Sequence, residues 1–97
     1  MEDNARTDVP AGGVAAMLLY RLDSISETVG EGDYEQASEA LSGRQWLDGI
    51  DLTGVPVAPI ARAQRWVDAA YDVLRSRDVD AHLVQHLLLE ARRALAS

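Results

Sequence analysis

The sequence has no cysteine and no lysine among its 97 residues. The absence of cysteine excludes disulfide bonds, thiolate nucleophiles and sulfur-ligated zinc. No apolar run approaches the roughly 20 residues that span a bilayer, so no association with a membrane is expected. The first ten residues, MEDNARTDVP, are acidic and polar where a secretory signal would be basic and then apolar. A cytoplasmic protein is therefore expected.

Basic residues are few, and the net charge of -7 is unevenly distributed. Residues 1–56 carry eleven acids and three arginines, whereas residues 57–97 carry five acids and six arginines. This acidic surface would repel a phosphate backbone, so no direct binding of nucleic acid is expected. A basic protein partner, or self-association between the unlike halves, is favoured instead. A solvated face that keeps a small domain soluble is the alternative interpretation. The acidic surface comprises Asp23, Glu27, Glu31, Asp33, Glu35 and Glu39.

Hydrophobic residues make up 47% of the chain and charged residues 26%, which is typical of one folded domain. Their spacing of three to four residues predicts amphipathic helices over about 13–29, 33–47, 58–77 and 80–96. We expect residues 1–12 to form a flexible N-terminal tail and residues 13–97 a single helical domain. The fold class predicted is all-α, either an antiparallel four-helix bundle or two stacked helical hairpins.

Local signals support the helix ends. Gly30 ends the first helix, and Asp33 is a suitable N-cap for the second, with Gln36 three residues later. Gly43 weakens the second helix, so Trp46 and Leu47 either continue it or form a separate turn. Pro59 suits the first turn of the third helix, and Asp80 suits the N-cap of the last. A strand over residues 55–57 would have no partner, so none is predicted.

The apolar stripe of each helix predicts the core. The inward positions are Val14, Met17, Leu18, Leu22, Ile25 and Val29; Tyr34, Ala37, Ala40 and Leu41; Ile60, Ala63, Trp66, Val67, Ala70, Tyr71 and Leu74; and Leu83, Val84, Leu87, Leu88, Ala91 and Leu95.

The stretch HLVQHLLLE places His82, His86 and Glu90 four residues apart, a spacing that makes a weak candidate metal site on a helix. The helical wheel turns this row away from the core, next to the cation of Arg93. No HExxH motif and no other histidine is present to complete a set of ligands. We therefore expect no metal or other cofactor, and a polar face that is exposed.

Several apolar residues lie off the stripes and are candidates for an interface. Leu89 lies on the outer face of the last helix beside the two histidines, and aromatic residues are enriched at the centres of interfaces. The alternative is that the off-stripe residues of the first two helices cover the ends of the bundle or pack under the loop of residues 48–57. The candidate interface residues are Leu19, Tyr20, Trp46, His82, His86 and Leu89.

No catalytic set is recognisable, because no serine has a histidine and an acid at a known motif spacing and the glycines form no phosphate loop. We therefore expect a non-enzymatic helical protein–protein interaction module, a homodimeric adaptor, assembly subunit or regulator. One alternative is an acidic, nucleic-acid-mimicking inhibitor of a nucleic-acid-handling complex, of the phage or mobile-element type. The other is a metal-dependent enzyme that uses the row of His82, His86 and Glu90.

Overall fold

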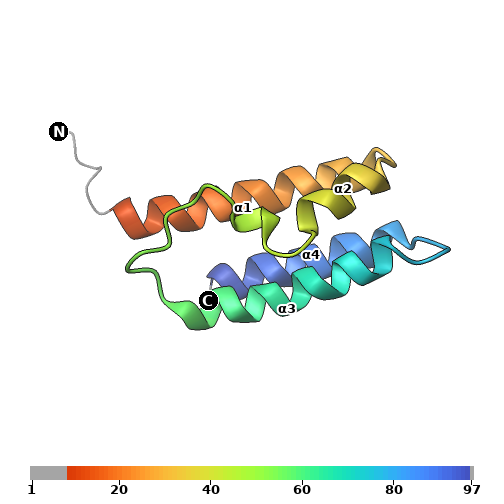
Figure 1. Ribbon diagram of the computed structural model, residues 1–97. Coiled ribbons are helices and arrows are strands. Elements are labelled where there is room, and N and C mark those ends of the chain that lie inside the picture. The colour runs from red at the N-terminus through yellow and green to blue at the C-terminus, as the bar shows by residue number, and fades with distance from the viewer. Residues whose placement is uncertain (1–8, 97) are drawn as a thin grey trace.

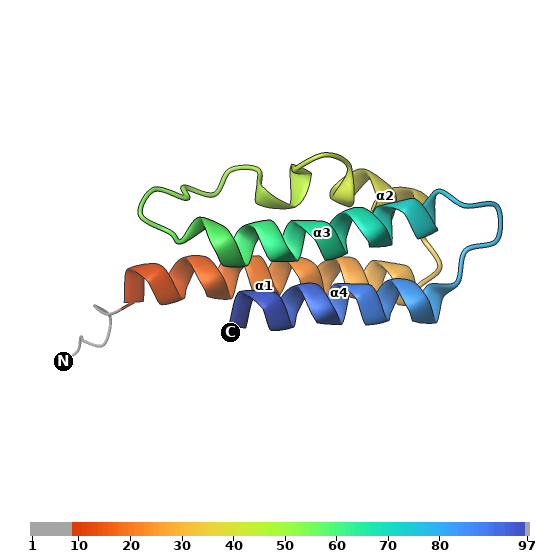
Figure 2. The same cartoon turned by 90° about the horizontal axis from the view of Figure 1, so that it is seen from below.

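The computed structural model describes residues 9–96, and side chains from Gly13 onward. The described part of the chain forms α1 (Val9–Gly30), α2 (Tyr34–Leu41), a 3₁₀ helix η1 (Gln45–Leu47), α3 (Val57–Leu74) and α4 (Ala81–Ala96). Consecutive helices run in opposite directions (Figures 1 and 2). Both α1 and α3 pack against α2 and α4, and α1 and α3 occupy opposite corners. The predicted all-α fold, an antiparallel four-helix bundle or two stacked helical hairpins, is confirmed.

The core lies along the bundle axis. Ala63, Ala70 and Ala91 are fully buried, and their small side chains let α3 and α4 approach closely. The other buried hydrophobic residues are Leu18, Leu22, Ile25, Val29, Ala37, Leu41, Trp46, Leu47, Ile60, Val67, Leu74, Val84, Leu87 and Leu88.

The second helix is shorter than the predicted span of residues 33–47, and Trp46 and Leu47 form the separate turn that was the alternative. The α2 helix ends at Leu41, and Gly43 then adopts a left-handed backbone conformation with φ of 59°. Such a glycine ends a helix because a side chain is disfavoured at positive φ. The chain then turns into η1, which carries Trp46 into the core.

The left-handed conformation makes Gly43 a test of this break. Gly43→Ala is expected to lower the free energy of unfolding by about 1–2 kcal/mol, because a Cβ is strained at positive φ. A Cβ at this position would contact no neighbouring atom, so the loss would reflect backbone strain alone. Urea unfolding followed by circular dichroism measures it. Gly43→Asn is the control and should lose less, because asparagine tolerates this conformation; equal losses would contradict the explanation.

Two other predicted ends differ from the structure. The α1 helix begins at Val9, so residues 9–12 of the predicted tail are helical; residues 1–8 lie outside the described residues. Pro10 is compatible with this because it falls in the first turn, where its missing N–H has no intrahelical acceptor. The α3 helix ends at Leu74 rather than at residue 77. Just beyond this end, the Ser76 hydroxyl donates a hydrogen bond to the Val73 carbonyl oxygen at 2.6 Å. That contact satisfies one of the carbonyl groups left without a partner at the helix end.

The predicted caps are confirmed. The Asp33 carboxylate accepts a hydrogen bond from the Gln36 backbone N–H at 3.2 Å, and Asp80 accepts one from Leu83 N–H at 3.1 Å. Pro59 lies in the first turn of α3, as expected. The Asp33 and Asp80 side chains satisfy N–H groups that have no partner inside a helix.

The segment of residues 48–56 covers the bundle where α2 is too short to do so. Its partly buried side chains Ile50, Leu52 and Val55 pack against the core, and no strand occurs anywhere in residues 9–96. Asp51 orders the segment by accepting a hydrogen bond from the Thr53 backbone N–H at 2.9 Å. The backbone and side-chain hydrogen bonds from Thr53 favour the ionised carboxylate and so lower the pKa of Asp51 below 3.8.

None of the helices in residues 9–96 combines the length and the apolar character needed to cross a membrane.

Candidate functional site

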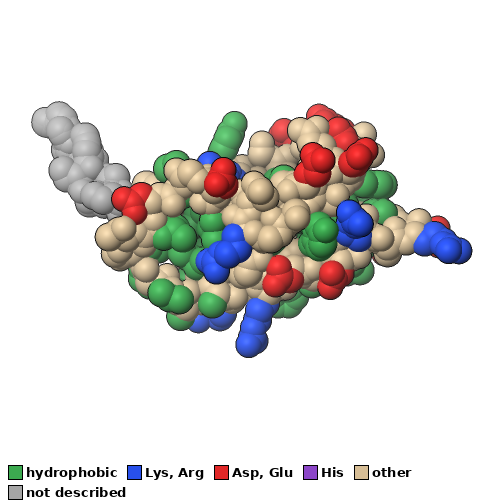
Figure 3. All heavy atoms as spheres, in the orientation of Figure 1, with side chains coloured by type: hydrophobic (Ala, Val, Ile, Leu, Met, Phe, Trp, Pro, Cys, Tyr) green, Lys and Arg blue, Asp and Glu red, His purple; other side chains and the backbone are tan. Residues whose placement is uncertain are grey.

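The acidic surface lies over α2 and the adjoining end of α1, where Figure 3 shows carboxylates gathered. Two of its six residues have structural partners. Asp23 forms an ion pair with Arg92 of α4 at 3.0 Å, and Asp33 caps α2. The exposed carboxylates without such a role are those of Glu27, Glu31, Glu35 and Glu39.

A groove of about 350 Å³ runs between α1 and α2 inside this acidic region. Its floor includes Ile25, Ala37 and Trp46, which are buried, and Tyr20 stands at its mouth with 73% of its surface exposed. Arg21 contacts the carbonyl oxygens of Trp46 and Asp48, which ties α1 to the chain around η1. The lining residues are Tyr20, Arg21, Ser24, Ile25, Thr28, Gln36, Ala37, Ala40, Gln45 and Trp46.

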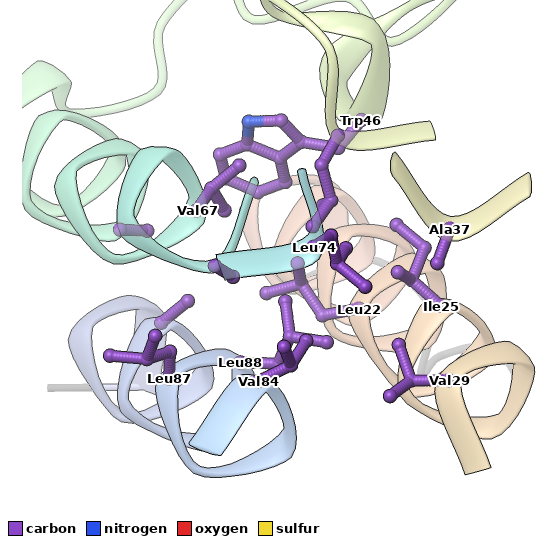
Figure 4. Packing of buried hydrophobic residues seen from close by; sticks show 14 of the residues in the cluster. Leu22, Ile25, Val29, Ala37, Trp46, Val67, Leu74, Val84, Leu87 and Leu88 are labelled. Carbon is purple, nitrogen blue, oxygen red and sulfur yellow. The ribbon is translucent and has the colours of Figure 1, made fainter. Parts of the chain in front are cut away.

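Trp46 is not an exposed interface residue, and its prediction as one is wrong. Its side chain is 1% exposed and lies among core residues of α1, α2 and α3 (Figure 4). The indole Nε1 donates a hydrogen bond to Gln64 Oε1 at 2.7 Å. Gln64 in turn donates to Asp68 at 2.7 Å, so η1 is joined to α3 by a polar network. Trp46 is therefore a core residue.

The other predicted interface residues do not form one surface. Tyr20 lies at the groove on α1, while Leu19 is only partly exposed on another side of that helix. His82, His86 and Leu89 lie exposed on α4. The structure therefore divides the predicted interface into separate parts.

The histidine row does not assemble a metal site. His86 Nε2 lies 3.8 Å from Glu90 Oε2, and the same oxygen lies 3.1 Å from Arg93 Nη1. Within residues 9–96, no three or more histidine, cysteine, aspartate or glutamate side chains are arranged to hold a metal ion. Because Arg93 already contacts the Glu90 carboxylate, the row is better described as a polar, exposed edge of α4.

Three residues assigned to the core are instead exposed. Met17 is 48% exposed, Trp66 is 38% exposed and Leu83 is 41% exposed. Each lies toward the edge of its helix's apolar stripe, where the neighbouring helix covers it incompletely. The stripe of α3 spans about 140°, with Trp66 and Tyr71 at its two edges. The position of Trp66 at an edge was the signal in the sequence that its neighbours could leave it exposed.

Trp66 lies on the side of α3 that adjoins α4. Gln64, two residues earlier, faces η1 through its hydrogen bond with Trp46. Two residues along an α-helix correspond to a rotation of about 200°, so Trp66 faces nearly the opposite way. Val73 is seven residues after Trp66 and shares its side of the helix.

Leu83 lies on the side of α4 that adjoins α3. Gln85 of α4 donates a hydrogen bond to the Ser26 carbonyl of α1 at 3.2 Å. Leu83 is two residues before Gln85, so the same rotation of about 200° turns it away from α1 and toward α3.

Trp66 and Leu83 therefore border the same long contact between α3 and α4, with partly buried Ala69 and Val73 beside them. We name this apolar region the seam surface and define it as Trp66, Ala69, Val73 and Leu83. His86 and Glu90 border it on α4, next to the helix side that carries Leu83. The region is an apolar patch with a polar rim, an arrangement typical of protein contact surfaces.

Comparisons of the chain with protein-family models, with curated proteins and with solved structures gave no match.

Proposed function

We propose that the protein is a non-enzymatic helical interaction module that acts as a homodimeric adaptor, assembly subunit or regulator. The observation that carries this proposal is the seam surface, where Trp66 and Leu83 are 38% and 41% exposed beside one helix–helix contact. The proposed location is the cytoplasm, as expected from the sequence.

The hydrophobic effect supports a partner at the seam surface. Removing apolar surface from water yields about 25 cal/mol per Å², and tryptophan is enriched among the residues that dominate binding energy. Trp66 and Leu83 come from two helices that make the most extensive helix–helix contact in the described part of the chain, with fully buried alanines on both. A partner would therefore meet a preformed surface, which lowers the entropy cost of binding.

We propose a second copy of this chain as that partner, joined through the two α3–α4 sides rather than through the unlike halves that the sequence favoured. Residues 57–97, which include α3 and α4, carry six arginines and five acids, whereas residues 1–56 carry eleven acids and three arginines. Two copies that meet through α3 and α4 bring nearly neutral surfaces together and keep the acidic α1–α2 sides apart. A two-fold symmetric contact of this kind is the commonest arrangement of homodimers.

The experiment is light scattering coupled to size-exclusion chromatography at protein concentrations from about 1 µM to about 1 mM. The mass should rise with concentration from 10.5 kDa toward twice that value. High salt should leave the dimer intact, because the contact is apolar. A constant mass of one chain at the highest concentration would overturn the dimer.

A further inference from the structure

The α1–α2 groove is an opening that the bundle does not fill. On the α2 side its lining residues include Ala37 and Ala40, whose side chains are too small to close the space opposite Ile25 and Thr28 of α1. Its volume of about 350 Å³ is within the range of pockets that bind ligands. Half of its lining is polar, with apolar surface at Tyr20 and over the floor of Ile25, Ala37 and Trp46, so an amphipathic partner suits it better than a purely apolar one.

Exposed carboxylates lie on both helices that form the groove. Glu27 of α1 and Glu39 of α2 are next in sequence to the lining residues Thr28 and Ala40, and the helical rotation of about 100° per residue turns both toward the outer side of the groove. Both glutamates are exposed, and residues 23–43 contain no basic residue that could neutralise them. Arg21, the one cation in the lining, is already held by the carbonyl oxygens of Trp46 and Asp48.

From these features we propose that the α1–α2 groove binds a basic amphipathic helix of another protein. Large apolar side chains of that helix enter the groove between Tyr20 and Ala40. Its arginine or lysine side chains lie over Glu27 and Glu39. An amphipathic helix in an apolar groove is a common mode of peptide recognition, and opposite charges at the rim select the partner and speed its association. The inference rests on the proposed role as an interaction module but does not require the dimer.

The test is isothermal titration calorimetry of the full chain with a panel of synthetic helical peptides. Each peptide carries leucine, isoleucine or tryptophan on one face with arginines beside them, and the spacing of the apolar residues varies across the panel. Matched peptides with glutamate in place of arginine are the controls. We expect saturable binding by a basic peptide at micromolar concentration, weaker at high salt, and no binding by its acidic counterpart.

Two protein variants separate the groove from general charge attraction. Ala40→Leu places a larger side chain in the groove and should weaken binding at least about tenfold. Ala58→Leu, at an exposed position in the first turn of α3, is its matched control and should bind like the wild type. Glu27→Gln with Glu39→Gln should weaken binding by about three- to tenfold at low salt and less at high salt.

Fluorescence locates the bound peptide. The chain has two tryptophans, so Trp66→Phe leaves Trp46, in the groove floor, as the only indole. A peptide of the panel that lacks tryptophan should change the emission of Trp46 in this variant when it binds in the groove.

The outcomes are distinct. Binding that is lost in Ala40→Leu and kept in Ala58→Leu supports the proposal. Equal binding to both variants, or no saturable binding by any basic peptide of the panel, overturns it. Light scattering on the same samples reports the dimer separately. A monomer that binds the peptide would refute only the dimer, and a dimer that does not bind would refute only the groove.

Discussion

Replacing Trp46 by alanine is expected to lower the free energy of unfolding by about 3–5 kcal/mol. Trp46 is the largest of the fully buried side chains, so its removal would leave a cavity among α1, α2 and α3. It would also remove the hydrogen-bond donor to Gln64, which links η1 to α3 at 2.7 Å. A domain of this size has a total stability of about 5–15 kcal/mol, so this one change would remove a large share of it.

Urea unfolding followed by far-ultraviolet circular dichroism measures the loss. Trp66→Ala is the matched control, because it truncates the same side chain at a position that is 38% exposed. At a protein concentration low enough to keep the chain monomeric, we expect it to cost about 1 kcal/mol. Equal losses in the two variants would contradict the assignment of Trp46 to the core and Trp66 to the surface.

Trp66→Glu combined with Leu83→Glu should weaken self-association by at least about 100-fold. In a two-fold contact the pair of changes would place four carboxylates in an apolar interface. Each would lose its hydration without gaining a partner, and all would repel one another. Each residue is already more than a third exposed, so the isolated chain should still fold.

Light scattering over the concentration range used for the wild type gives the change in dimer dissociation, and circular dichroism checks the fold. Leu89→Glu is the control, since Leu89 is 38% exposed but lies on the side of α4 that carries Gln85. It should leave the dimer intact. If Leu89→Glu dissociates the dimer and the double variant does not, the contact lies on the outer face of α4, beside His82 and His86, and not at the seam surface.

Much of the fold follows from local sequence signals. The spacing of apolar residues is sufficient to place four helices, because each helix must bury one face wherever its neighbours lie. The caps at Asp33 and Asp80 are also local, since each side chain bonds a backbone N–H three residues away. For the same reason, the exposure of Tyr20 and of the two histidines could be expected from their positions outside the stripes.

The surfaces of the candidate sites could not be read from periodicity alone. Trp46 lies inside because the chain turns at Gly43, which adopts a left-handed backbone conformation. The hydrogen bond from Trp46 to Gln64 of α3 then fixes the indole against that helix. Trp66 and Leu83 lie at stripe edges, where exposure depends on how closely the neighbouring helix covers them.

The sequence therefore decided the number and approximate positions of the helices and which central positions of each stripe are buried, because hydrogen bonding and apolar spacing act within a few residues. The packed structure alone decided that Ala37 and Ala40 border an open groove and that Trp66 and Leu83 border one seam. These features arise between elements that are distant in sequence, where the separation and facing of two helices determine what stays exposed.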